Sequence, residues 1–223
     1  SGYGLVKSPE TTFTEKDFYI GQSYEDNVYV KSKFEAEKLI YEEIGNGLSA
    51  CIFRIGNISN RYSDGKFQIN TSENAFVNRI KAILKLGVIQ NKLLEHSIEF
   101  TPVDICSDAI IKIIKSNPKF TVFHLFNNNL VRLDTLLANL NSLNIHIKPV
   151  SDEDFSKAIT TFLNSESLRN DISGIITDLD KNKLLNLINN LLPASDFTQS
   201  YLKLLGFSWP KIDINYINKY IQY

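Results

Sequence analysis

The feature that most constrains the fold is a long helical pattern that leads directly into a short apolar run. Residues 24–44 contain alanine, glutamate and lysine but no glycine or proline, and the pattern ends at Gly45-Asn46-Gly47. The following run at residues 49–55, SACIFRI, is short and apolar, which is typical of a strand buried on both faces. A helix that feeds a buried strand predicts an α/β fold.

The rest of the chain alternates between helical and extended patterns and then becomes mostly helical. Before residue 130, the sequence predicts helices at 73–86 and 105–115 and extended segments at 97–103 and 120–126. After it, the sequence predicts amphipathic helices at 130–143, 152–163, 181–192 and 196–205, a last helix that ends at 223, and one strand at 145–150. Residues 1–23 contain three glycines and a proline and are predicted to form a loop.

Composition and charge argue against several classes of function. The 223 residues are 43% hydrophobic and carry a net charge of −1 with both signs interleaved, which argues against a nucleic-acid-binding or membrane-surface protein. No apolar run is long enough to cross a membrane and the N-terminus does not resemble a signal peptide, so we expect a cytoplasmic protein. The three histidines lack the spacing of metal ligands, and no metal site is predicted.

Two compositional details bear on the origin of the chain. The sequence contains no methionine and therefore no initiator residue, which indicates a segment of a longer polypeptide. Asparagine, isoleucine and lysine are abundant, which suggests an A/T-rich bacterial genome. We therefore expect the chain to be part of a larger bacterial protein.

Tyr29 and Lys33 are the candidate catalytic residues. They lie four residues apart near the start of the predicted helix, so both should project from one face. A phenol and an ammonium one turn apart can share a proton-transfer step, because the positive charge favours the phenolate. The same spacing occurs in residues 3–7 and 62–66, but a glycine interrupts the helical pattern in both. The alternative interpretation is a surface tyrosine beside a solvated lysine.

The order of these motifs resembles that of the extended short-chain dehydrogenase/reductases. Within that superfamily, the chain is similar to the terminal thioester reductase domains of nonribosomal peptide synthetases. The resemblance covers essentially the whole chain and rests on the loop at 14–22, Tyr29 to Lys33 with Ala36-Glu37, the strand at 53–58, the FTPVD run at 100–104 and the LGFSWP run at 205–210. Together these motifs are much more specific than any one of them.

The resemblance implies a Rossmann-like fold and roles for individual residues. Residues 1–58 and 98–128 would be the C-terminal half of a parallel-sheet, NAD(P)-binding domain, and residues 59–97 and 129–223 a mostly helical subdomain that faces substrate and carrier. Tyr29 would donate a proton, and Lys33 would hold the nicotinamide ribose. The cofactor-binding residues Gly56, Asn57 and Ile58 would lie against the nicotinamide, at the end of a strand where α/β sheets bind ligands.

The implied reaction is the reductive release of an acyl or peptidyl thioester from a phosphopantetheinylated carrier protein, as an aldehyde or an alcohol. NADPH is the implied cofactor, with NADH as the alternative. The glycine-rich phosphate-binding turn and the catalytic Ser/Thr of the family are absent from the sequence, so the N-terminal half of the same domain is an expected partner and this segment alone is expected to be inactive. Two alternatives remain, namely a sugar-nucleotide epimerase or dehydratase of the same superfamily and a non-catalytic docking module for a carrier protein.

Overall fold

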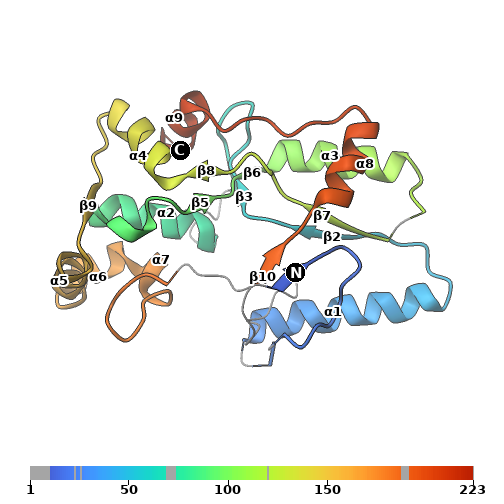
Figure 1. Ribbon diagram of the computed structural model, residues 1–223, viewed down its shortest axis with the longest axis horizontal. Coiled ribbons are helices and arrows are strands. Elements are labelled where there is room, and N and C mark those ends of the chain that lie inside the picture. Colours follow the sequence, from blue (N-terminus) through green and yellow to red (C-terminus); the bar gives the residue numbers. More distant parts are fainter. Residues whose placement is uncertain are drawn as a thin grey trace. The chain divides into compact units, whose positions relative to one another are not determined.

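The computed structural model describes residues 11–22, 24–25, 27–68, 74–119, 121–186 and 191–222. The chain divides into two compact units (Figure 1). Unit 1 comprises Ser1–Gly56, Cys106–Phe126 and Ile188–Trp209, and unit 2 comprises Asn57–Ile105, Asn127–Leu187 and Pro210–Tyr223. Each unit combines helices with short strands, and four of the five strand pairs formed by the described residues are parallel. The predicted α/β class is therefore confirmed.

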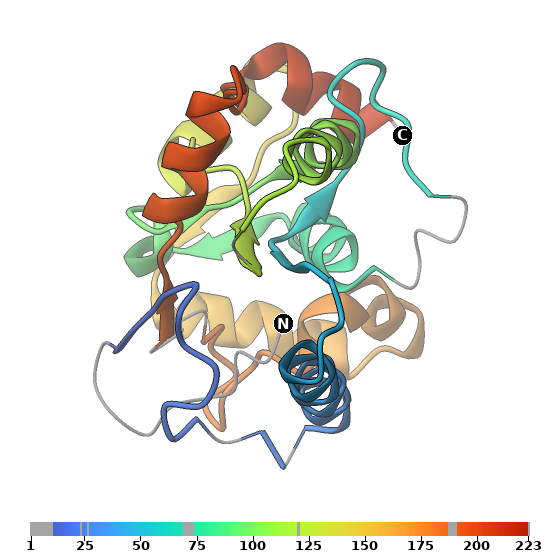
Figure 2. The ribbon, with the colours of Figure 1, turned by 90° about the vertical axis from the view of Figure 1, so that its right-hand side faces the viewer.

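Unit 1 is built around two parallel strands with a helix on each face. Its elements are β1 (Thr11–Phe13), α1 (Val28–Gly45), β2 (Ile52–Ile55), most of α3 (Val103–Lys115), β7 (Val122–Leu125), β10 (Leu191–Pro193) and α8 (Asp196–Leu204). Strands β2 and β7 pair with Ile52 opposite Val122, and α1 and α3 lie on opposite faces of the pair (Figures 1 and 2). β7 is buried throughout, whereas three of the four residues of β2 are half-buried. The strand predicted at 49–55 is present but less buried than expected.

Unit 2 is mostly helical. Its elements are β3 (Ile58–Ser59), α2 (Ala75–Leu86), β4 (Val88–Gln90), the short 3-10 helix η2 (Asn91–Leu93), β5 (Ser97–Ile98), β6 (Thr101–Pro102), β8 (Val131–Arg132), α4 (Leu133–Ser142), β9 (Lys148–Val150), α5 (Asp152–Leu163), α6 (Glu166–Asp171), α7 (Ser173–Ile176) and α9 (Ile214–Gln222). Helix α2 packs against α5, α6 and α7, and α4 packs against α9. One apolar core joins α2, α4, α5, α7 and α9, so unit 2 has a hydrophobic centre of its own.

Local sequence signals explain where α2 begins and why α7 can approach it closely. Asn74 caps α2 by accepting a hydrogen bond from the Val77 backbone N–H at 2.9 Å. Helix α7 approaches α2 so closely that a Cβ at Gly174 would lie 2.3 Å from the carbonyl oxygen of Asn78. A glycine is therefore required at that contact.

Within the described ranges, no helix is both long and apolar enough to span a membrane.

The helix predicted at 181–192 is wrong. A carboxylate oxygen of Asp180 accepts hydrogen bonds from the backbone N–H groups of Asn182 at 2.8 Å and Leu184 at 2.9 Å, and Lys183 has a φ of 61°. These contacts form a tight turn, which competes with helix formation. Residues 187–190 lie outside the described ranges, and the chain continues as β10. The loop predicted at 1–23 contains β1, while residues 1–10 lie outside the described part.

Candidate active site

Tyr29 lies in the first turn of α1. The side-chain oxygen of Asn27 accepts hydrogen bonds from the backbone N–H groups of Tyr29 and Val30, both at 3.1 Å. Asparagine is a favourable N-cap because this contact satisfies N–H groups that have no partner within the helix. With this cap, the helix begins at Val28, four residues after the predicted start. Tyr29 therefore lies at the N-terminal end of the helix, which is the positive end of the helix dipole.

Tyr29 and Lys33 lie side by side on the exposed face of α1. The Tyr29 side chain is 66% exposed, and Nζ of Lys33 lies 5.4 Å from the centre of the Tyr29 ring. That distance is within the range of a cation–π interaction. The structure therefore brings the two candidate catalytic side chains together, as their spacing predicts. Their role in catalysis stays a prediction.

The opposite face of α1 is fixed by aromatic packing. Phe34 is buried, and its ring stacks on Tyr24 at 3.9 Å and on Phe18 at 4.6 Å between ring centres. Both partners precede the helix in the chain, so the preceding segment folds back onto α1. Stacked aromatic pairs add stability beyond the area that they bury. This packing holds the helix that presents Tyr29 and Lys33.

Arg54 of β2 stands at the centre of a buried polar network beneath α1. Arg54 is 2% exposed and forms an ion pair with the buried carboxylate of Glu37, with Nε at 3.0 Å from the carboxylate oxygen. Its guanidinium also donates to the carbonyl oxygens of Asp17 at 2.7 Å and Thr14 at 3.3 Å. Nη1 lies 2.9 Å from Nε2 of His124. The network therefore connects α1, β2, β7 and the segment after β1.

The same network determines the protonation state of His124. A guanidinium only donates hydrogen bonds, so Nε2 of His124 must accept, and Nδ1–H donates to the carbonyl oxygen of Ala194 at 2.5 Å. Burial lowers the pKa of His124, which also favours the neutral ring. The histidine is therefore a structural link rather than a metal ligand. Within the described ranges, no three His, Cys, Asp or Glu side chains lie close enough together to hold a metal ion.

The sequence motifs described above do not predict this network, although the sequence contains one signal for it. Arg54 interrupts the apolar run at 49–55, and an arginine in a buried strand is rare unless its charge is paired. The partner Glu37 lies on the inner face of α1, where a carboxylate is equally unusual. Opposite charges at two positions that are both expected to be buried therefore indicate that Arg54 and Glu37 form an ion pair.

A cleft of 310 Å³ lies between α1 and the beginning of β2. It is lined by Lys33, Ala36, Glu37 and Ile40 of α1 and by residues 50–53. Among the described residues, β2 pairs with β7 alone. The second edge of β2 therefore has backbone groups that no described strand satisfies, which is the usual property of a site where another strand adds.

The predicted cofactor residues Gly56, Asn57 and Ile58 follow β2 directly. The backbone N–H of Gly56 donates to the carbonyl oxygen of Leu125 at 3.0 Å, which continues the pairing of β2 with β7 in unit 1. Asn57 and Ile58 belong to unit 2, where Ile58 pairs with Thr101. The structure thus places these three residues at the carboxyl end of a parallel strand, while their contact with a nicotinamide stays a prediction.

Glu99 holds the turn at Asn57. One carboxylate oxygen accepts a hydrogen bond from the Asn57 backbone N–H at 2.7 Å, and the other accepts a short one from the Thr101 hydroxyl. Thr101 in turn accepts from the backbone N–H of Asn127 at 3.0 Å. Burial raises the pKa of Glu99 to about 7, although the hydrogen bonds from Asn57 and Thr101 favour the charged form. No sequence motif had marked Glu99.

The raised pKa predicts that Glu99 makes stability depend on pH. The folded state binds this proton more tightly than the unfolded chain, so its contribution is complete below about pH 4 and is lost as the pH rises through about 7. Because of Glu99, the free energy of unfolding measured by urea denaturation should be about 1–3 kcal/mol lower near pH 8 than near pH 5. In Glu99→Gln, which cannot ionise, that difference should be smaller by the same amount. Equal pH dependence in both proteins would contradict the assignment.

Comparison with known proteins identifies relatives of the chain. Residues 7–110 match the model of an NAD-binding family described as "Male sterility protein". The chain is 32% identical to the thiolation-reductase di-domain of an archaeal nonribosomal peptide synthetase, with a TM-score of 0.82 over 96% of this chain and 44% of that one. The resemblance to these reductase domains is confirmed. No curated protein sequence matches the chain.

Two further reductase domains share the fold. The reductase domain of the aureusimine biosynthetic cluster is 24% identical with a TM-score of 0.79, over 99% of this chain and 56% of that one. The terminal R domain of the myxalamid PKS-NRPS pathway is 22% identical with a TM-score of 0.78, over 100% of this chain and 55% of that one. The chain spans about half the length of the reductase-domain structures that it matches.

Proposed function

We propose that this chain is part of a reductase that releases a carrier-bound acyl or peptidyl thioester as an aldehyde or, after a second reduction, as an alcohol. The observation that carries the proposal is the 32% identity to a di-domain whose name joins a reductase to a thiolation domain. That pairing supports a phosphopantetheinylated carrier protein as the partner. The proposed cofactor is NADPH, with NADH as the alternative.

The exposed face of α1 fits the proton transfer that such a reduction requires. When bound, NADPH would supply a hydride to the carbonyl carbon of the thioester, which leaves negative charge on the carbonyl oxygen. Once that oxygen is protonated, the C–S bond would break, so that the aldehyde and the thiol of the carrier are released. The hydroxyl of Tyr29, exposed and in the first turn of α1, is free to donate a proton to that oxygen. The ammonium of Lys33 lies over the Tyr29 ring and stabilises the phenolate that remains. Lys33 is also the proposed donor to the ribose hydroxyls.

The unpaired edge of β2 supports a second partner. Among the described residues, β2 pairs with β7 alone, and the cleft between α1 and β2 is lined by residues 50–53 at the beginning of β2. Two-stranded parallel sheets are rarely stable without further strands. We propose that the N-terminal half of the same reductase domain continues the sheet there and brings the phosphate-binding turn. On this proposal, the chain alone does not turn over substrate.

The substrate dependence of NADPH oxidation tests the proposal in the intact parent protein. An acyl thioester on a phosphopantetheinylated carrier should stimulate oxidation and yield an aldehyde or an alcohol, while a nucleotide sugar should not. Conversion of a nucleotide sugar without a thioester would instead establish an epimerase or dehydratase. Binding of the carrier protein without any binding of NADPH would establish a docking module, and either result would overturn the proposal.

A further inference from the structure

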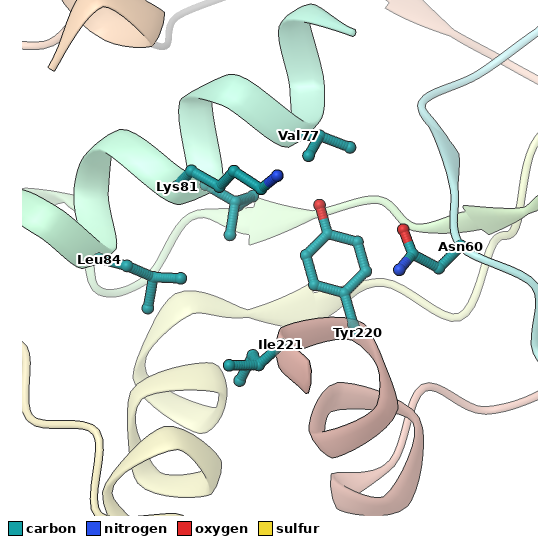
Figure 3. A pocket seen from close by; sticks show the side chains of 7 residues that line it. Asn60, Val77, Lys81, Leu84, Tyr220 and Ile221 are labelled. Atoms are coloured by element: carbon teal, nitrogen blue, oxygen red, sulfur yellow. The ribbon is translucent and has the colours of Figure 1, made fainter. Parts of the chain in front are cut away.

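A small cavity in unit 2 lies between α2, α9 and the segment that follows β3. Its volume is about 40 Å³, and the side chains shown around it are Asn60, Val77, Lys81, Leu84, Tyr220 and Ile221 (Figure 3). One water molecule needs about 10–15 Å³ of such space, so the cavity holds roughly three non-hydrogen atoms. It therefore has room for more than one water molecule but not for a large ligand.

The hydroxyl of Tyr220 is the unusual feature of this cavity. Tyr220 is 8% exposed, and its hydroxyl has no hydrogen-bond partner among the described residues. Figure 3 shows the hydroxyl directed into the space between Val77 and Asn60. Burial raises the pKa of Tyr220, so the group stays protonated and is able to donate. A buried hydroxyl without a partner destabilises the folded state, and a bound ligand that accepts its hydrogen bond would remove that cost.

Two further polar side chains face the same space. The amide nitrogen of Asn60 donates one hydrogen bond to the carbonyl oxygen of Gly65 at 2.7 Å, and the amide oxygen is the acceptor that Asn60 can offer to a ligand. Asn60 is buried, and the Tyr216 hydroxyl donates to its carbonyl oxygen at 2.8 Å, which holds it in position. The exposed side chain of Lys81 extends over the cavity with its ammonium toward Tyr220 (Figure 3). The cavity thus offers two donors and one acceptor.

This set matches an aliphatic alcohol. A hydroxyl oxygen accepts up to two hydrogen bonds and donates one, which fits donation by Tyr220 and Lys81 and acceptance by Asn60. Val77, Leu84 and Ile221 provide apolar surface for a short carbon chain. A carboxylate has no proton for the Asn60 oxygen, and an alkylammonium would be repelled by Lys81. We propose that this cavity binds the hydroxyl end of a short aliphatic chain, a site separate from Tyr29 and Lys33.

The binding of ethanol to the 223-residue chain tests this site without any turnover. Ethanol has three non-hydrogen atoms, and ligands of that size reach at best a Kd of about 1 mM. In methyl-labelled protein, ethanol should shift the NMR signals of Val77, Leu84 and Ile221 and saturate at tens of millimolar, whereas acetate and ethylamine should not. Linear shifts with all three compounds would mean that the cavity holds water only and would overturn the proposal.

A pair of tyrosine variants separates binding from packing. Tyr220→Phe should weaken ethanol binding by about 2- to 10-fold, the usual effect of one lost hydrogen bond, while the free protein stays at least as stable because an unsatisfied group is removed. Tyr62→Phe is the control, since Tyr62 lies in the same unit but does not line the cavity. Undiminished ethanol binding in Tyr220→Phe, or a marked loss of stability on urea denaturation, would overturn the proposal. Failure of the reductase assay would leave these results unaffected.

Discussion

If Tyr29 is the proton donor of the proposed reductase, replacing it with phenylalanine in the complete reductase domain should lower kcat by about 10²- to 10⁴-fold, the usual contribution of a positioned general acid. Phenylalanine keeps the ring beneath the ammonium of Lys33 but removes the only proton that this side chain can donate. The Kd for NADPH should therefore stay close to its original value. Steady-state oxidation of NADPH with a carrier-bound thioester gives kcat, and a titration of NADPH in the absence of thioester gives the Kd.

The chain contains a matched control for this experiment. Residues 62–66 have the same tyrosine-lysine spacing, but they form a turn rather than a helix. The hydroxyl of Tyr62 makes a long hydrogen bond of 3.4 Å to the carbonyl oxygen of Lys211, so Tyr62→Phe should leave kcat within about 2-fold of the original. Full turnover in Tyr29→Phe would exclude Tyr29 as the donor, and a loss of NADPH binding would show that the variant acts on the cofactor instead.

The second large effect is expected at the buried ion pair. Arg54→Met should lower the free energy of unfolding by about 3–5 kcal/mol, because the carboxylate of Glu37 stays buried without its partner. The carbonyl oxygens of Thr14 and Asp17 lose a donor as well. Urea denaturation of the 223-residue chain measures this loss, and far-UV circular dichroism shows whether the variant folds at all.

A double variant and a surface pair make this prediction specific. Removing both charges with Arg54→Met and Glu37→Leu should be less destabilising than Arg54→Met alone, because no unpaired charge is left in the core. Arg61→Gln breaks an ion pair with Asp64 that is exposed to solvent, and such pairs contribute about 0–1 kcal/mol. A loss below about 1 kcal/mol in Arg54→Met would show that water reaches this network.

The sequence predicted those parts of the fold that depend on local pattern. The predicted helix at 152–163 agrees with α5, where Ser151 caps the first turn and Phe155 and Ile159 form the buried stripe. The helix at 181–192 was wrong because its apolar spacing resembles a helix, while Asp180 directs the backbone into a turn. Periodicity reports which residues are apolar, but it does not weigh a single side-chain contact against helix formation.

By itself, the sequence determined the α/β class, the position of β2 and the shared face of Tyr29 and Lys33, because helix and strand periods are properties of neighbouring residues. Only the tertiary structure brings Arg54 into contact with Glu37 and His124, and Glu99 into contact with the backbone of Asn57. It also brings Glu15 into contact with the hydroxyl of Thr198, which follows it by 183 positions in the chain. Such contacts depend on which charges become buried together, and burial is decided by the packing of distant segments. For the same reason, the sequence alone does not show that the hydroxyl of Tyr220 lacks a hydrogen-bond partner among the described residues, because that depends on how α2 packs near α9.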